Sequence, residues 1–320
     1  GGRQATITDA YAVCGFLGSG DLGYGAVHLD IGRAKTAVGG IAAAMQLPLE
    51  QAAEAIIKVS ISGMFLEVSK LFSHQGADPR TFALLPFGGA GPMTACLLAR
   101  DLGLETIVVP PTPGVLAAYG GLIADIRNDF IRTAFVDLAD RGAGDLAPLA
   151  RALEVRALDW LRNEQQFEGE ARLMYSADMR YRGQSYEIEV ALERAWLDAG
   201  SAAEIAAAFH REHARVYEHA DERAPVQVIN LRLVVAGAAP RPETMPAPLQ
   251  VRPATPVDEA KVYYDGAWTI ASIYDRGRLV PGEQLAGPAI IRQDDCTTCL
   301  VGGYRARIDA FANIIVTREA

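Results

Sequence analysis

The stretch FALLPFGGAGPMTACLLARDLGLETIVVPP, residues 82–111, contains the pattern that decides the fold. Its first apolar run, 82–87, stops at a glycine-rich turn, 88–91, and apolar residues at helical spacing follow over 92–102. A second apolar run covers 105–109. This order predicts a strand, a glycine loop, a helix and a second strand, and therefore an α/β fold.

The glycine loop, Gly88-Gly89-Ala90-Gly91, has a backbone that can approach a ligand closely, because glycine has no Cβ and tolerates positive φ. Pro92, at the first helical position, lacks an N–H that would have no intrahelical partner anyway. The free N–H groups of the loop and first turn can donate to a polar ligand. A plain tight turn is the alternative, since the loop matches neither GxxxxGK[ST] nor a dinucleotide-binding GxGxxG fingerprint.

The composition is typical of a globular protein with two domains of ordinary size. The 320 residues are 50% hydrophobic and 22% charged. A formal net charge of −9 argues against non-specific binding to nucleic acid, because a phosphate backbone would be repelled. No apolar run is long enough to cross a bilayer, and no signal segment opens the sequence. We therefore expect a cytoplasmic protein without nucleic-acid or membrane partners.

Periodicity predicts further elements on both sides of the loop. Two helices are expected before it, over 30–46 and 48–75, and residues 127–138 alternate like a strand. Arg182-Gly183-Gln184 lies between two alternating runs and predicts a hairpin. An alanine-rich helix is expected over 201–218.

These patterns suggest four consecutive parts. We expect an α/β part over 1–138, an α+β domain over 139–237, an extended proline-rich linker over 238–259 and a β-rich segment over 260–320.

Segments along the whole chain resemble the hydantoinase A / 5-oxoprolinase family, which also includes the β subunits of acetone carboxylases. One of them is the glycine loop with its alanine-rich helix. The similar segments, in the family's order from residue 1 to about 317, are GGRQATITDA, GADPRTFALLPFGGAGP, MRYRGQSYEIEV, FHREHARVYEHA, VQVINLRLVVAG, YDRGRLVPGEQLAGPAII and DDCTT.

The resemblance implies the actin, Hsp70 and sugar-kinase fold, in which two related lobes close over ATP. Residues 1–138 would be part of such an ATP-binding lobe, followed by a strand-rich α+β domain. In that superfamily a Gly-Gly loop contacts the adenosine and the α-phosphate, and Gly88, Gly89, Ala90 and Gly91 match it. Family enzymes use ATP, with Mg²⁺, to activate an unreactive group as a phosphorylated intermediate.

The implied activity is ATP-dependent opening of a small cyclic amide, such as a hydantoin-like or 5-oxoproline-like ring. Two alternatives stay open. The chain could be a subunit of an ATP-dependent ketone carboxylase, which needs the same phosphorylation step with another acceptor. It could also be a structural or assembly half of a split enzyme, without activity of its own.

The sequence departs from the family pattern at the phosphate loops. Family proteins carry Asp-Gly-Gly-Thr-type loops upstream of the segment that corresponds to Thr6-Ile7-Thr8-Asp9-Ala10, and no DxGGT occurs in these 320 residues. We therefore expect a C-terminal fragment or one half of a split subunit. Such a chain would not turn over ATP by itself. It would work in an oligomer with the missing N-terminal part of the ATPase and a hydantoinase B-type subunit.

Thr8 and Asp9 are the catalytic candidates, because they lie in the segment that resembles the family's TDA motif. Asp9 could contact a metal ion, the phosphates or the substrate. Capping of a following helix is an equal alternative for either residue. No metal ligand is assigned to any residue.

Two clusters favour structural interpretations. His210, His213 and His219 accompany charged residues near the alanine-rich helix, which predicts a solvated face rather than a metal site. Cys296 and Cys299 form a lone CxxC without further zinc ligands nearby, and we expect buried thiols on a strand, as for Cys14 and Cys96.

Polar residues around the predicted hairpin could bind a carboxylate, and local hydrogen bonds that fix the turn are the favoured alternative. Asp275 and Arg276 are expected to form an ion pair of the same kind. The hairpin residues are Arg180, Arg182, Gln184 and Glu187.

Overall fold

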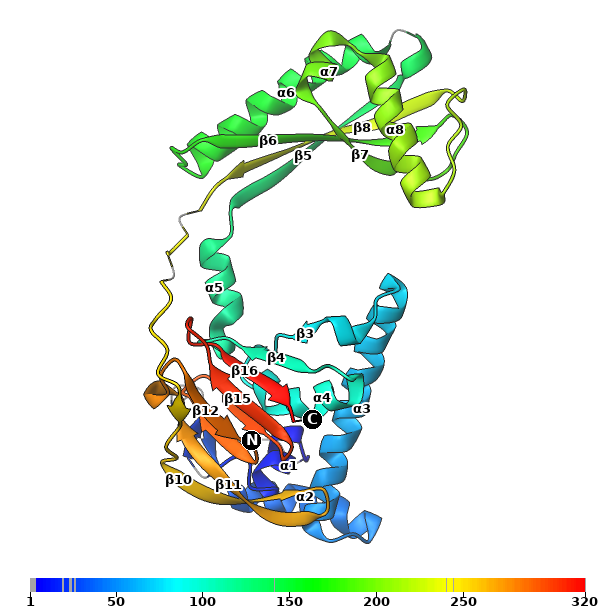
Figure 1. Cartoon of the computed structure of the whole chain (residues 1–320). Coiled ribbons are helices and arrows are strands. Elements are labelled where there is room, and N and C mark those ends of the chain that lie inside the picture. The colour runs from blue at the N-terminus through cyan, green and yellow to red at the C-terminus, as the bar shows by residue number, and fades with distance from the viewer. Residues whose placement is uncertain are drawn as a thin grey trace. The chain divides into compact units, whose positions relative to one another are not determined.

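The computed structural model describes residues 4–18, 20–22, 25, 27–140, 142–239, 241–243 and 245–319. The first three residues of the segment GGRQATITDA therefore lie outside the described residues. Contacts divide the chain into two units (Figure 1). The first unit comprises Gly1–Gly121 and Glu243–Ala320, and the second comprises Leu122–Pro242.

The helices of the first unit begin and end where the sequence supplies caps. Asp30 Oδ1 accepts from Arg33 N at 3.1 Å at the start of α2, and α3 ends at Gly76, which has left-handed φ. The predicted helices 30–46 and 48–75 are thus confirmed. The helices are α1 (Ile7–Val13), α2 (Ile31–Met45), α3 (Leu49–Gln75), α4 (Gly91–Leu102) and α5 (Leu116–Ile123), the last of which crosses the boundary in sequence.

A six-stranded sheet and a four-stranded sheet share the core of the first unit with these helices. The six-stranded sheet has the order β3-β4-β16-β15-β12-β9, and β3 and β4 pair in parallel. Its strands are β3 (Ala83–Leu84), β4 (Thr106–Val109), β9 (Arg252–Pro253), β12 (Glu283–Ala286), β15 (Tyr304–Ile308) and β16 (Ile314–Arg318).

The four-stranded sheet has the order β10-β11-β13-β14, and β1 pairs with β2 as a separate antiparallel ribbon. The alternating runs expected in the C-terminal segment are therefore strands. Their bounds are β1 (Gly20–Leu22), β2 (Val27–Leu29), β10 (Asp258–Tyr264), β11 (Ala267–Asp275), β13 (Ala289–Arg292) and β14 (Thr297–Leu300).

The pairing of β16 with β4 joins two strands that lie far apart in the sequence. Val316 is opposite Ile107 in the antiparallel register, and both side chains are buried. Helix α4 contacts both β4 and β14. By contacts, residues 260–320 therefore belong with the N-terminal helices rather than to a separate segment, because they complete the hydrophobic core of the first unit.

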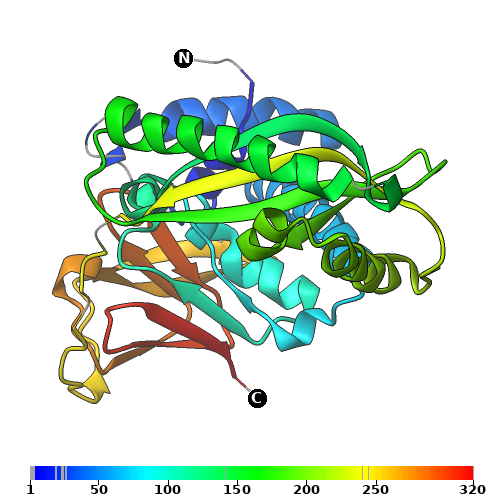
Figure 2. The ribbon, with the colours of Figure 1, turned by 90° about the horizontal axis from the view of Figure 1, so that it is seen from above.

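The second unit is an antiparallel sheet with helices on one face. In Figures 1 and 2, β5, β8 and β6 run side by side, and α6 and α8 pack on the sheet. Contacts place β5 here, so the unit begins before residue 139. Its elements are β5 (Ile126–Asp137), α6 (Leu146–Asp159) with a π-helical turn (Trp160–Glu164), β6 (Ala171–Tyr181), β7 (Ile188–Leu192), α7 (Arg194–Ala199), α8 (Ala202–Tyr217) and β8 (Val226–Gly237).

The sheet of the second unit confirms the predicted hairpin, since β6 and β7 pair antiparallel around residues 182–184. The mixture of helices and sheets agrees with the expected α/β class. Within the described ranges, no helix has the length and apolarity needed to cross a membrane. Short 3-10 helices complete the chain: Pro79–Thr81, Pro113–Val115, Leu138–Asp140, Gly142–Asp145 and Arg276–Arg278.

Candidate functional site

A cavity of about 320 Å³ lies at the start of α4 and includes part of the glycine loop. It brings together three of the residues singled out from the sequence, Thr8, Gly89 and Ala90, with a polar loop from the other end of the chain. The lining residues are Thr8, Leu17, Gly89, Ala90, Met93, Gln293, Asp294, Asp295, Cys296 and Thr297.

The glycine loop holds two backbone donors ready for a ligand. Gly88 has φ +78°, a conformation that favours glycine, and its N–H donates to Pro113 O at 2.7 Å. Helix α4 begins at Gly91 without a side-chain cap. Among the described residues, no group accepts from the N–H of Gly89 or Ala90. These N–H groups, next to the positive end of the helix dipole, can donate to an anion.

The loop between β13 and β14 supplies carboxylates to the same cavity. Asp295 Oδ2 accepts from Gly114 N at 2.8 Å, and its Oδ1 is buried without a partner in the described part of the chain. Gln293 fixes the same loop, because its Nε2 donates to Pro111 O at 2.6 Å and its N–H to Cys296 O at 3.1 Å. The side chains are therefore held in place before any ligand binds.

These groups fit a phosphate-bearing ligand that carries a divalent cation. The N–H groups favour an anion, whereas Asp294 and Asp295 would repel it unless a cation lay between them. Mg²⁺ prefers carboxylate and phosphate oxygens and keeps several waters. No group of three or more His, Cys, Asp or Glu in the described ranges could hold a metal ion by itself, so such an ion would depend on the ligand's own oxygens.

Thr8 and Asp9 have different surroundings although they are neighbours on α1. Asp9 is part of a capping box: its Oδ2 accepts from Thr6 N at 2.8 Å, and its N–H donates to Thr6 Oγ1 at 3.3 Å. Thr8 lines the cavity. The geometry therefore gives Asp9 a local hydrogen-bonding role and leaves Thr8 as the residue of the pair that a ligand would contact.

The sequence did not assign a role to Gln293, Asp294 or Asp295. The available signal was an acidic pair directly after the buried apolar strand β13, since polar residues at strand ends are frequent site residues. Nothing local shows that this strand end lies beside a loop some 200 residues earlier.

The histidine cluster is structural, and the predicted solvated face is wrong for His213. This side chain is only 5% exposed, and its Nδ1 lies 2.6 Å from His219 O. His210 Nδ1 lies 2.8 Å from the hydroxyl of Tyr181, whose ring also contacts His213. The face of α8 that carries these histidines packs against the end of β6.

Three of the four hairpin residues form local hydrogen bonds, as expected. Arg180 Nη1 lies 3.1 Å from Glu187 Oε1, and Gln184 Oε1 accepts from Tyr181 N at 3.1 Å. Arg182 bonds outside the hairpin, to Asp137 of β5, and the buried Nε of Arg180 has no hydrogen-bond partner in the described part of the chain.

The predicted ion pair between Asp275 and Arg276 is wrong. Arg276 is buried and donates to Ala312 O, whereas Asp275 pairs with Arg278 at 3.4 Å and accepts from Gly277 N. The 3-10 turn after β11 directs successive side chains to different sides, so adjacent residues do not meet.

The four cysteines are free and buried, as expected, and Cys299 lies on β14. Cys296 is at the cavity, with its Sγ 4.0 Å from Gln293 Oε1. Burial raises the pKa of Cys296 to about 12, so this thiol stays protonated near neutral pH.

The fold is shared with a solved ATP-dependent enzyme. The crystal structure of the ATP-dependent caprolactamase from Pseudomonas jessenii superposes with a TM-score of 0.73 and 27% identity, covering all of this chain and 47% of that one. Its nucleotide-binding fold is actin-like, which confirms the expected fold class.

The chain belongs to the hydantoinase/oxoprolinase family. Residues 1–130 match the hydantoinase/oxoprolinase family, and residues 140–319 match the hydantoinase/oxoprolinase C-terminal domain. The family resemblance found in the sequence is thereby confirmed.

Two characterised relatives are subunits of larger enzymes by name. The caprolactamase subunit alpha of Pseudomonas jessenii is 30% identical over 99% of this chain and 47% of its own length. The acetone carboxylase beta subunit of Xanthobacter autotrophicus is 26% identical over 96% of this chain and 45% of its own length. The chain thus spans slightly less than half the length of these relatives.

Proposed function

We propose that this chain supplies the glycine-loop wall of an ATP site in a hydantoinase/oxoprolinase-type enzyme that opens a cyclic amide. The observation that carries the proposal is the cavity lined by Gly89, Ala90 and Asp295, where the two N–H groups and Asp295 Oδ1 have no partner among the described residues. The relation to an ATP-dependent caprolactamase supports ATP as the nucleotide and a lactam or imide as the substrate class.

Five residues of the cavity have a defined task in this proposal. Gly89 and Ala90 donate to phosphate oxygens, Thr8 donates or accepts through its hydroxyl, and Asp294 and Asp295 hold Mg²⁺ through its water shell. ATP, when bound, supplies the phosphoryl group that converts an unreactive amide oxygen into a leaving group. Further walls of the site, including DxGGT-type phosphate loops, would come from an N-terminal ATPase part, and a hydantoinase B-type subunit would complete the oligomeric enzyme.

Nucleotide binding by the 320-residue chain tests the proposal. ATP with Mg²⁺ is expected to raise Tm, with ~1.4 kcal/mol of stabilisation at ten times Kd. Gly89→Val should abolish the shift, because the added side chain enters the cavity. The new Cβ would lie 3.4 Å from Asp295 O, which is an ordinary van der Waals contact, so the backbone does not have to move. Gly63→Val is the matched control, since it adds the same side chain in open space on α3.

A missing shift in the wild-type chain, with intact folding, would contradict a nucleotide wall and favour the structural or assembly role. A shift that Gly89→Val leaves unchanged would place the nucleotide elsewhere.

A ketone carboxylase subunit is the second candidate function, favoured by the match to the acetone carboxylase beta subunit over 96% of this chain. The same cavity would serve both activities, since each begins with phosphorylation. The assembled enzyme, assayed with lactams, hydantoins and 5-oxoproline against acetone plus bicarbonate, decides between them. ATP turnover that depends on bicarbonate would support the carboxylase.

A further inference from the structure

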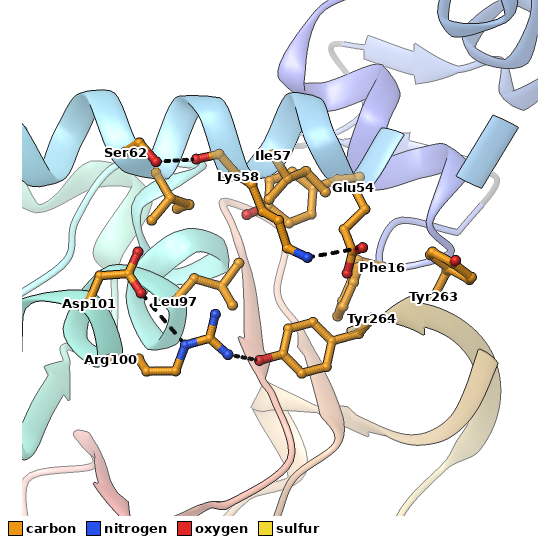
Figure 3. A pocket seen from close by; sticks show the side chains of 12 residues that line it. Phe16, Glu54, Ile57, Lys58, Ser62, Leu97, Arg100, Asp101, Tyr263 and Tyr264 are labelled. Carbon is orange, nitrogen blue, oxygen red and sulfur yellow. Dashed lines mark hydrogen bonds and ion pairs between the residues drawn. The ribbon is translucent and has the colours of Figure 1, made fainter. Parts of the chain in front are cut away.

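A second cavity, of about 270 Å³, lies between α1, α3, α4 and the end of β10 (Figure 3). It shares no lining residue with the glycine-loop cavity. Its walls are mostly apolar, with charged groups at the edge. The lining residues are Tyr11, Phe16, Glu54, Ile57, Lys58, Ile61, Ser62, Leu97, Arg100, Asp101, Tyr263 and Tyr264.

Tyr11 gives this cavity a buried and unused polar group. The side chain is 1% exposed, and its hydroxyl has no hydrogen-bond partner among the residues that the structure describes. Its ring packs edge-on against Phe16, with centroids 5.8 Å apart. A buried hydroxyl normally has a partner, because leaving it unpaired costs about 1–3 kcal/mol. A cavity next to an unpaired hydroxyl indicates a missing partner.

Tyr304 is a buried tyrosine with a structural role, and it can be compared with Tyr11. It is 2% exposed, and its hydroxyl donates to Cys96 O at 3.1 Å. Among the described residues of this unit, the hydroxyl of Tyr304 therefore has a hydrogen-bond partner, whereas that of Tyr11, which lines the cavity, has none.

The charged groups at the edge are already paired. Lys58 Nζ lies 3.1 Å from Glu54 Oε2, and Arg100 is 3.7 Å from Asp101 and donates to Tyr264 Oη (Figure 3). Arg100 also lies 3.7 Å from Asp265. Both cations therefore have carboxylate partners. An ionised ligand would lose its hydration in an apolar cavity without gaining a free counter-charge.

We propose that this cavity binds an uncharged small molecule with an apolar body about the size of one ring and an oxygen that accepts a hydrogen bond from the Tyr11 hydroxyl. Burial raises the pKa of Tyr11 well above its usual range, so the hydroxyl remains a neutral donor at physiological pH. Ile57, Ile61 and Leu97 would cover the apolar body, while the ion pairs at the edge stay intact.

Cyclohexanone is a suitable probe, because it combines a six-membered apolar ring with one carbonyl acceptor. It is titrated without nucleotide into the 320-residue chain, and Kd is obtained from protein chemical-shift changes. Saturable binding is expected. Cyclohexanecarboxylate, which carries a charge on the same ring, should bind at least tenfold more weakly.

Tyr11→Phe is the decisive variant, since it removes only the hydroxyl. The affinity for cyclohexanone should fall about fivefold to tenfold, the equivalent of one neutral hydrogen bond. Tyr304→Phe removes a buried hydroxyl that does not line the cavity and should leave Kd unchanged.

Ser62→Trp provides a second variant that does not alter the core. Ser62 is exposed at the cavity edge on α3, and an indole there should block entry. Ser73→Trp is the control, because Ser73 is also exposed on α3 and makes the same hydrogen bond to the carbonyl four residues earlier. Reduced binding in the first variant and wild-type binding in the second are expected.

Several results would overturn the proposal. They are the absence of saturable cyclohexanone binding, an equal Kd in the wild type and Tyr11→Phe, and equal Kd values for Ser62→Trp and Ser73→Trp. A crystal of the chain soaked in cyclohexanone that shows only a water on the Tyr11 hydroxyl would identify a hydration site instead.

Discussion

Gly114 N donates to Asp295 Oδ2 at 2.8 Å, and the two residues approach so closely that only glycine fits at position 114. A Cβ at this position would lie 2.4 Å from Asp295 O and 2.6 Å from Asp295 Cβ. Pro113 lies in the same turn after β4, and its carbonyl oxygen accepts a hydrogen bond from Gly88 N. This turn therefore links the glycine loop to the acidic loop between β13 and β14.

Gly114→Ala should destabilise the first unit by about 1–3 kcal/mol, because backbone atoms must move to admit the methyl group. Gly40→Ala, on α2 with open space around it, should stabilise by up to ~1 kcal/mol through helix propensity. Urea unfolding reported by Trp268 fluorescence, with Trp160 and Trp196 of the second unit replaced by Phe, measures both. An unchanged midpoint for Gly114→Ala would contradict the close contact.

Asp295→Asn should leave stability within about 1 kcal/mol, because the amide oxygen can still accept from Gly114 N. The Mg²⁺-dependent part of the ATP thermal shift should disappear, since one cation-holding charge is lost. Binding of metal-free ATP should be equal or stronger, because a repulsive charge is removed. The same substitution at Asp159, on α6, serves as the control. Full retention of the Mg²⁺ dependence in Asp295→Asn would exclude this role.

The hydrogen bonds of Asp137 with Arg182 predict a pH-dependent contribution to the stability of the second unit. Arg182 Nε donates to Asp137 Oδ2 at 2.8 Å, and this bond lowers the pKa of Asp137 below its usual value. The folded state thus binds the proton less readily than the unfolded state. The stabilisation is present at neutral pH and is lost as pH falls below about 4 toward the folded pKa.

Asp137→Asn should therefore cost about 1 kcal/mol at pH 7, a moderate value because half of the Arg182 side chain is in water. The difference from wild type should shrink between pH 5 and pH 3. Urea midpoints read from Trp160 and Trp196 fluorescence measure it. Asp129→Asn is the control, since Asp129 and Arg127 are exposed and 3.7 Å apart. A constant difference down to pH 3 would contradict the assignment.

The cysteines should be unreactive in the folded chain. Burial raises the pKa of Cys14, Cys96 and Cys296 to about 12 and raises that of Cys299 as well. At pH 8 a thiol with such a pKa is a thiolate only about one time in ten thousand. Ellman's reagent should label the native chain slowly and all four thiols in denaturant. Rapid labelling of Cys296 or Cys299 would show a reactive pair instead.

Local patterns predicted the elements well where the chemistry is local. Helices α2, α3 and α4 and the hairpin of β6 and β7 follow from apolar spacing, caps and turn residues. The first strand is shorter than its apolar run, because only Ala83 and Leu84 pair with β4, and Phe82, Leu85 and Phe87 stay exposed. An apolar run shows what can be buried, whereas strand pairing requires a neighbour.

The surroundings of individual polar residues could not be predicted in the same way. His213 and Arg276 are ordinary polar positions in the sequence, yet both are buried, because distant segments cover them. The division by contacts differs from the expected boundaries for a related reason. Strand β16 pairs with β4, and a pairing between strands so far apart in the sequence has no local sequence signal.

The sequence by itself determined the family, the α/β class and the glycine loop, since these depend on residue type and on spacing over a few turns of chain. Only the tertiary structure decided that Asp295 lies beside Gly89 and that Tyr11, whose hydroxyl has no partner in the described part of the chain, lines a cavity. The physical reason is that backbone geometry and periodic burial act between near neighbours. A site, in contrast, is formed where the packing of one core brings remote segments within van der Waals distance.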